Sequence, residues 1–188
     1  MNEKSAMDVR TSANPAVGLR PATMGDVEAL YVLIEEAAHA TTVLPRAKES
    51  IGKHLRDFVV AEAEGRLVGC GALYLSAPYL AEIRSLVVRE ELRGQGIGPR
   101  LVEALLAEAR RLGIARVFAL TDNVAFFRKA GFRPSSKDTL PHKVWNDCVR
   151  CSKFLHCTEE AVDLSLTAVG PGRAAANANP RASGSKQV

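Results

Sequence analysis

The chain has 188 residues, of which 47% are hydrophobic, a length and composition typical of one soluble globular domain. Its net charge of +4 looks like a sign of nucleic-acid binding, but three of the surplus cations, Arg173, Arg181 and Lys186, lie in segment 164–188, which has no acid. The rest of the chain is close to neutral and has no stripe of Lys and Arg, so we expect no nucleic-acid partner.

Segment 1–16 is polar and lacks the apolar stretch of a signal peptide. No window approaches the ~20 apolar residues of a membrane span. We therefore expect a cytoplasmic protein with no membrane partner. In that compartment its four cysteines are expected as thiols or metal ligands rather than disulfides.

Three parts follow from the composition along the chain. Segment 1–16 is expected to be a flexible arm, and segment 17–166 carries the alternating strand and helix patterns of one α/β domain. From residue 167 to 188, Gly, Pro, Ala, Asn and Ser dominate without periodicity, which predicts a disordered tail.

The elements of the domain are predicted from hydrophobic period and from capping residues. Thr23 begins the first helix, with Asp26 as the acid of a capping box, and Pro99 suits the first position of a later helix. The predicted strands cover 17–20, 58–63, 67–75, 81–88 and 116–121, with less certain ones from residue 132. The predicted helices begin at Thr23, cover 47–55, run from Pro99 to residue 112, and cover 124–130.

The strongest chemical signal is a glycine-rich loop between a strand and a helix. Its glycines allow successive N–H groups to point into one concavity, and the helix N-terminus behind them adds partial positive charge. This arrangement predicts a pyrophosphate site; the alternative is a glycine-rich turn that binds nothing. The loop residues are Arg93, Gly94, Gln95, Gly96, Ile97 and Gly98.

Two common phosphate motifs are excluded by the spacing. Gly98 is followed by Pro99 and Arg100 instead of Lys-Ser/Thr, and only one residue separates Gly96 from Gly98. The loop instead resembles the Arg/Gln-x-x-Gly-x-Gly/Ala motif of GNAT acetyltransferases, matched by Arg93, Gly96 and Gly98. That resemblance implies acetyl-CoA as cosubstrate and a mixed, mostly antiparallel sheet that splays at the acetyl-CoA site, with helices on both faces.

A second segment resembles the same family. Asn123, Phe126, Phe127 and the pair Gly131-Phe132 are similar to the family segment Asn-x-x-Ala-x-x-Phe-Tyr-x-x-x-Gly-Phe, in a register shortened before Phe126. The resemblance implies that the first three contact the cosubstrate. Phe127 stands where many relatives have a tyrosine that protonates the thiolate, so this chain lacks that phenol. Core packing is the other interpretation of the two phenylalanines.

Within the family, the chain is most similar to the acetyltransferase domain of N-acetylglutamate synthases, without their kinase-like domain. The segments that carry this resemblance are 44–49, 81–88, 117–121 and 143–153. It implies that the carboxylates of an amino-acid substrate are held by a set of cationic and hydroxyl side chains. That set is Arg46, Ser85, Arg150 and Ser152.

The resemblance also implies that Glu82 is the general base and that Thr121 assists the departing thiolate. An ammonium group cannot attack a thioester, so a base is required, and a glutamate on a largely apolar strand is a reasonable candidate. The alternative is an exposed charge or a salt bridge to Arg84, which shares its strand face. The oxyanion is expected to meet a backbone N–H from the stretch Leu86, Val87 and Val88.

Two arginines suit a dicarboxylate because guanidinium binds carboxylate in a bidentate manner, although a single arginine is more often a surface residue.

Cys70 has no evident His partner and is expected in the core. A metal site or redox-active cluster is a further hypothesis, with reduced thiols as the alternative; zinc is not favoured. The candidate ligands are Cys148, Cys151, Cys157 and His156.

Two other functions stay open at this point. The acceptor can be another amine, such as glutamine, a peptide N-terminus or a small-molecule amine, because one fold serves many acceptors. The chain can also be a regulatory module that binds coenzyme A without turnover. A homodimer is expected only by analogy with the family.

Overall fold

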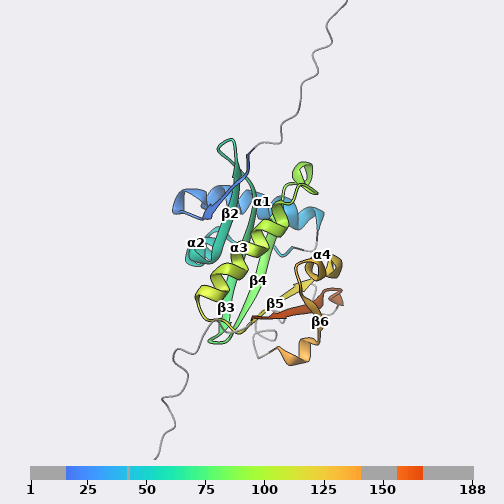
Figure 1. Ribbon diagram of the computed structural model, residues 1–188. Coiled ribbons are helices and arrows are strands. Elements are labelled where there is room, and N and C mark those ends of the chain that lie inside the picture. Colours follow the sequence, from blue (N-terminus) through green and yellow to red (C-terminus); the bar gives the residue numbers. More distant parts are fainter. Residues whose placement is uncertain (1–15, 42, 141–155, 167–188) are drawn as a thin grey trace, which may run out of the picture.

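The computed structural model describes residues 16–41, 43–140 and 156–166. In these residues seven strands form one sheet in the order β1-β2-β3-β4-β5-β7-β6 (Figure 1). The strands are β1 (Gly18–Pro21), β2 (Phe58–Ala63), β3 (Arg66–Ala77), β4 (Leu80–Val88), β5 (Arg116–Thr121), β6 (Arg133–Ser135) and β7 (Glu160–Ser165). The helices are α1 (Val27–Ala40), α2 (Lys48–Lys53), α3 (Ile97–Arg111) and α4 (Val124–Lys129). Short 3-10 turns are η1 (Met24–Asp26), η2 (Leu55–Asp57), η3 (Glu90–Leu92) and η4 (Lys137–Thr139).

Helices α1 and α3 cover opposite faces of the sheet, and Figure 1 shows α3 crossing in front of β3 and β4. On β3, Ala72 packs in the core that contains Leu30 and Ile34 of α1, whereas its neighbour Leu73 packs in the core that contains Leu105 of α3. Successive residues of a strand point to opposite faces, so one strand serves both cores. The α/β class expected from the sequence is confirmed.

The sheet opens between β4 and β5. These two strands form a parallel pair, and their paired residues run from Leu80↔Arg116 to Glu82↔Phe118. Strand β4 continues to Val88 and β5 to Thr121 without further pairing between them. All other neighbouring strands are antiparallel. The mixed, mostly antiparallel sheet with a splayed centre is therefore confirmed.

Several predicted bounds shift by one or two residues. Strands 58–63 and 116–121 have the predicted bounds, whereas the helix predicted from Pro99 begins at Ile97. Gly96 takes the N-cap position in left-handed conformation, which allows the helix to start directly after the loop. Pro99 then lies inside the first turn, where its missing N–H has no intrahelical partner to lose. The predicted helix 47–55 is divided into α2 and η2.

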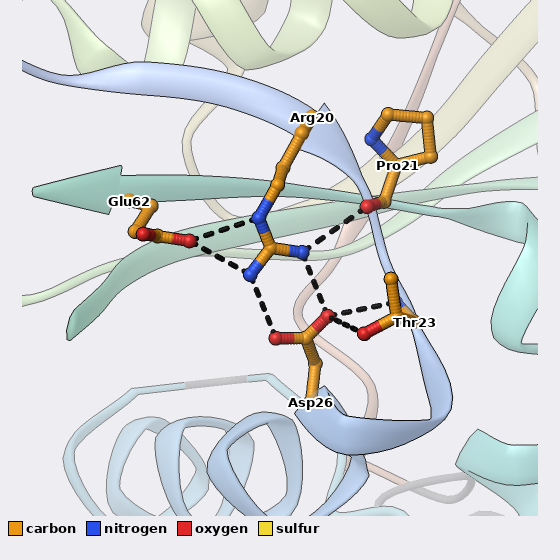
Figure 2. Close-up of polar contacts among 5 residues, drawn as sticks. All are labelled: Arg20, Pro21, Thr23, Asp26 and Glu62. Atoms are coloured by element: carbon orange, nitrogen blue, oxygen red, sulfur yellow. Dashed lines mark hydrogen bonds and ion pairs between the residues drawn. The ribbon is translucent and has the colours of Figure 1, made fainter. Parts of the chain in front are cut away.

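An arginine-centred cluster fastens the first strand to the start of α1 (Figure 2). The Arg20 guanidinium donates to both carboxylate oxygens of Asp26, at 2.7 and 2.8 Å, and its Nε donates to Glu62 of β2 at 2.8 Å. The backbone N–H and the hydroxyl of Thr23 also donate to Asp26, at 2.7 and 2.8 Å. Mainly because of the hydrogen bonds from Arg20, the pKa of the Asp26 carboxyl lies well below its usual range.

The predicted ends of the domain lie largely beyond the described residues. Apart from Ala16, the predicted arm 1–16 and the predicted tail 167–188 both fall outside them. Within the described segments, no helix combines the length and apolar character that a membrane span requires.

Candidate active site

A cavity of about 1390 Å³ lies where β4 and β5 part. It is lined by the loop after α1, the second half of β4, the glycine-rich loop, the first turn of α3, the end of β5 and the start of α4. Pockets for one small ligand usually have volumes of about 300–1,000 Å³, so this cavity has room for a cosubstrate and an acceptor together.

A β-bulge shapes the floor of this cavity. On β3, Cys70 pairs with Val87 and Ala72 with Arg84, so Ser85 and Leu86 stand opposite the single residue between them. Ser85 has a φ of 51°, which is rare for a residue other than glycine. A bulge leaves its extra residue out of the ladder and re-aims the strand, a device found next to active sites. The bulge lies at the stretch where the sequence predicts a backbone N–H for the oxyanion, and that role stays a prediction.

The bulge also explains a glycine on the neighbouring strand. A Cβ at Gly69 would lie 2.9 Å from the Val87 carbonyl oxygen, closer than real Cβ contacts. Cys70, beside it, is fully buried, and burial raises the pKa of its thiol to about 12. This thiol donates to the Ser85 carbonyl oxygen, with a Sγ–O distance of 3.4 Å. Cys70 is thus a core residue, as expected.

The glycine-rich loop has the backbone that an anion site requires. Gly94 and Gly96 have φ of 79° and 80°, a conformation that favours glycine, and a Cβ at either would meet nothing within 4 Å. The space beside both glycines is therefore open, and the N-terminus of the 15-residue helix α3 follows directly. The Arg93 Nε donates to the Val88 carbonyl oxygen at 3.2 Å. These features fit a pyrophosphate group.

The remaining loop residues differ in their relation to the cavity. Ile97 and Gly98 line it, as do Arg93, Gly94 and Gly96. Gln95 does not line the cavity. Its side-chain amide instead donates to the Glu91 carbonyl oxygen at 3.5 Å. A Cβ at Gly98 would lie 3.2 Å from the Phe126 ring, so glycine there serves the close approach of α3 and α4.

The two candidate catalytic residues stand on the two strands that part. Glu82 is the last residue of β4 that pairs with β5, it is half-buried, and it lines the cavity. Thr121 ends β5 and lines the same cavity. The Thr121 hydroxyl oxygen accepts the Asn123 backbone N–H at 2.9 Å, which leaves its own O–H to donate elsewhere.

The segment after β5 positions one aromatic ring in the cavity and one in the core. The Asn123 side chain caps α4 by accepting the Phe126 N–H at 3.1 Å. Phe127 is 5% exposed and packs edge-on against Phe132, with ring centroids 5.1 Å apart. Phe126 is only half-buried and lines the cavity beside it. Core packing is therefore the role of Phe127, although part of its surface reaches the cavity.

One side of the cavity is a connected group of polar and aromatic residues, which we call the arginine wall. The Arg46 Nε donates to the Ser85 hydroxyl at 2.7 Å, so these two predicted residues are in direct contact. The guanidinium carbon of Arg84 lies 3.7 Å from the centroid of the Tyr74 ring, and that ring contacts the ring of His54. The arginine wall comprises Arg46, His54, Tyr74, Glu82, Arg84 and Ser85, all of which line the cavity.

Sequence reasoning missed several lining residues. His54 and Tyr74 stand on other elements than Glu82, and no local motif marks them. Lys137 and Asp138 come from η4, which is fastened by Arg116. This arginine pairs with Asp163 of β7 and donates to the hydroxyls of Ser135 and Thr139 at 3.1 Å.

The remaining candidates lie partly outside the described residues. Arg150, Ser152, Cys148 and Cys151 fall in segment 141–155, which the structure does not describe. His156 is exposed, whereas Cys157 is half-buried, lines the cavity and accepts from Lys137 Nζ at 3.4 Å. In the described ranges, no group of three or more His, Cys, Asp and Glu side chains is arranged to hold a metal ion.

A splayed sheet, a glycine-rich loop before a helix and a carboxylate beside the opening are the features expected of an acyltransferase that uses coenzyme A as the acyl carrier. The chain matches the acetyltransferase (GNAT) family over residues 26–132, and it belongs to this family.

Two relatives are similar in sequence. The chain is 40% identical over 148 residues to the uncharacterized N-acetyltransferase CT2212 of Chlorobaculum tepidum, covering 79% of this chain and 96% of that protein. It is 35% identical over 127 residues to the amino-acid acetyltransferase of Neisseria meningitidis, covering 66% of this chain and 29% of that protein. The chain thus spans under a third of the second relative.

Two solved structures are similar as well. N-acetylglutamate synthase from Neisseria gonorrhoeae, complexed with coenzyme A and N-acetyl-glutamate, matches with a TM-score of 0.72 and 29% identity. That match covers 80% of this chain and 35% of the synthase chain. Rv2747 from Mycobacterium tuberculosis, in complex with CoA, matches with a TM-score of 0.68 and 30% identity over 79% of this chain and 99% of that one.

Proposed function

We propose that this protein transfers the acetyl group of acetyl-CoA to the α-amino group of L-glutamate or a related amino acid. The observation that carries the proposal is that one cavity joins the anion loop, Glu82 and an arginine, Arg46, held by Ser85. Support also comes from the relatives named amino-acid acetyltransferase and from the synthase structure with bound N-acetyl-glutamate. A glutamate acceptor would make this the first step of arginine biosynthesis, in the cytoplasm.

The charges along the cavity suit such an acceptor. Glu82 offers a carboxylate to the ammonium group, and the cations Arg46, Arg84 and Lys137 line the same space. An amino acid with two carboxylates complements this mixture, because guanidinium binds a carboxylate through paired hydrogen bonds. In this proposal Arg150 and Ser152, which lie outside the described residues, complete the carboxylate site.

The reaction proceeds as a direct transfer in a ternary complex. Glu82, directly or through a water molecule, takes a proton from the ammonium group, and the free amine attacks the thioester carbonyl. The oxyanion is met by a backbone N–H from the Leu86–Val88 stretch next to the bulge. The C–N bond forms and the C–S bond breaks. The nitrogen loses its second proton, directly or through water, to the departing thiolate, which leaves as the free thiol of coenzyme A. The Thr121 hydroxyl donates a hydrogen bond to that sulfur.

The test is thiol release from acetyl-CoA with glutamate, aspartate, glutamine or no acceptor. We expect turnover with glutamate, and a loss of about 10²–10⁴-fold in kcat when Glu82→Gln removes the base. The matched control is Glu103→Gln, an exposed glutamate on α3 outside the cavity, which should retain wild-type activity.

Other outcomes separate the alternatives. Turnover with glutamine alone would make glutamine the acceptor instead of glutamate. Turnover with a peptide N-terminus or a small amine, and with no amino acid, would assign the acceptor to that class of amine. Binding of acetyl-CoA without transfer to any amine would point to a regulatory module and contradict the proposal. An unchanged kcat in Glu82→Gln would remove that residue as the base.

A further inference from the structure

Arg84 stands at the centre of the arginine wall. It shares a strand face with Glu82, two residues away, and lines the cavity. Its guanidinium carbon lies 3.7 Å from the centroid of the Tyr74 ring, a distance at which the cation is attracted by the ring face.

The Tyr74 ring, which Arg84 contacts, also contacts the His54 ring. Tyr74 pairs directly with Glu82 across β3 and β4, and its ring lies 5.7 Å from the His54 ring at an interplanar angle of 58°. The His54 Nδ1 lies 3.5 Å from a carboxylate oxygen of Asp57. The ring that Arg84 contacts is thus itself in contact with a second side chain, His54. A side chain braced in advance loses less freedom when it binds a ligand.

The other charges around the stack set its chemistry. Burial raises the pKa of the Asp57 carboxyl, and the positive charges of His54, Arg84 and Arg46 oppose this rise. Arg46 donates to the hydroxyl of Ser85, the residue next to Arg84, so two guanidinium groups line the cavity on the side of Glu82. The carboxylates of Asp122, Asp138 and Glu159 line other parts of the same cavity. The two guanidinium groups suit carboxylates of a ligand, and Glu82 beside them suits an ammonium group.

We propose that Arg84 is a specificity-determining residue that binds a carboxylate of the acceptor, and that Tyr74 is the positioning residue that holds its guanidinium. This inference rests on the proposed function, since it assigns a further contact to the same acceptor. Strand residues two apart are separated by about 7 Å, so Glu82 and Arg84 can engage the amino group and a carboxylate of one amino acid at the same time.

The test compares three ligands in the wild type and in Arg84→Ala. They are glutamate, glutamine, which lacks the side-chain carboxylate, and 4-aminobutyrate, which lacks the α-carboxylate. The measured quantities are the KM of glutamate and the inhibition constants of the two analogues against glutamate. We expect Arg84→Ala to weaken glutamate about 10- to 100-fold, as for the loss of a charged hydrogen bond.

One of the two analogues lacks the carboxylate that Arg84 binds, and it makes no contact with Arg84 in the wild type. The inhibition constant of that analogue should therefore rise less than about threefold in Arg84→Ala. The KM of acetyl-CoA should not change. Equal weakening of all three ligands, or none for glutamate, would overturn the inference. Arg84→Gln, which keeps more of the side chain, gives the same comparison if the alanine variant does not fold.

The positioning role has its own readout. Tyr74→Phe keeps the ring, so the difference in affinity between glutamate and the analogue should stay as in the wild type. Tyr74→Leu removes the ring, so this difference in affinity should fall toward the value in Arg84→Ala. Arg110→Ala, an exposed residue of α3 outside the cavity, is the control with unchanged constants. A wild type that binds acetyl-CoA but does not acetylate glutamate would fail the proposed function itself, and the inference would fall with it.

Discussion

At the scale of single residues, Ser85 contributes both to the backbone bulge of the site and to the position of the Arg46 side chain. Its φ of 51° makes the bulge, and its hydroxyl accepts from the Arg46 Nε at 2.7 Å. A residue in this conformation is tolerated only where its surroundings hold it, and such strain gathers at functional sites. The carbonyl of Ser85 is held by the buried Cys70 thiol, so the residue is anchored at both its backbone and its side chain.

Ser85→Ala should therefore release Arg46 without removing its charge. We expect the KM of glutamate to rise about 10-fold, the effect of losing one hydrogen bond to a charged group, and the KM of acetyl-CoA to stay unchanged. Steady-state kinetics with each substrate varied in turn measures both.

A double-mutant cycle with Arg46→Ala serves as the control. If Ser85 acts through Arg46, the double variant should be no worse than Arg46→Ala alone. Fully additive losses would show that the two side chains act independently, and would contradict this role of Ser85.

At the scale of elements, the glycine-rich loop and α3 act as one unit. Gly96 is both the last loop residue in left-handed conformation and the N-cap of the helix. The loop therefore fixes where the helix begins, and the helix N-terminus fixes where the partial positive charge lies. The predicted anion site depends on this single backbone conformation.

Gly96→Ala should disturb the loop through strain alone, because a Cβ there would meet no atom within 4 Å. The left-handed conformation costs about 1–2 kcal/mol for an L-residue, which should appear as lost stability in urea unfolding. Relaxation of the strain moves the loop N–H groups, so we expect the KM of acetyl-CoA to rise about 10- to 100-fold.

The matched control is Gly52→Ala in α2, where a Cβ also meets nothing within 4 Å but the backbone is helical. That variant should gain about 0.5–1 kcal/mol, because alanine favours a helix over glycine. Equal effects of the two substitutions would argue against the role of the left-handed turn.

At the scale of the whole molecule, two arginine-centred clusters join segments that are distant in sequence. Arg20 joins β1, β2 and η1, and Arg116 joins β5, β6, β7 and η4. The second cluster holds the turn that brings Lys137 to the cavity, whereas the first stabilises the edge of the sheet. The two clusters thus secure different parts of the molecule, the edge of the sheet and one wall of the cavity.

The Arg20 cluster should make stability depend on pH. The folded pKa of Asp26 lies below its unfolded value of about 3.9, so its contribution is present above about pH 4 and is lost as the pH falls further. Asp26→Asn should therefore cost about 1–3 kcal/mol at pH 7, reduced by the partial exposure of Arg20, and less at pH 2–3.

Thermal and urea unfolding at pH 7 and at pH 3 checks this expectation. The wild type should lose more stability between the two pH values than the variant. A constant difference between the two proteins across this range would mean that the Asp26 carboxylate is not the group that titrates.

Local signals in the sequence were sufficient for much of the fold. The bounds of β2 and β5 match the prediction because a short apolar strand ends where its hydrophobic pattern ends. The capping acid Asp26 was found from its spacing to Thr23, although Arg20 as its main partner was not. The roles of Glu82, Thr121 and Arg46 were implied by family resemblance, and they stay predictions that activity measurements must test.

The sequence by itself determined the family, the position of the glycine-rich loop and the strand that carries Glu82, because these depend on residues that are neighbours in the chain. Only the tertiary structure decided the bulge at Ser85, the contact of Arg46 with Ser85 across 39 residues, and the stack of Arg84, Tyr74 and His54. The physical reason is that register and side-chain contact arise between elements that fold onto one another. No local period or spacing records which strands pair or which side chains meet in the cavity.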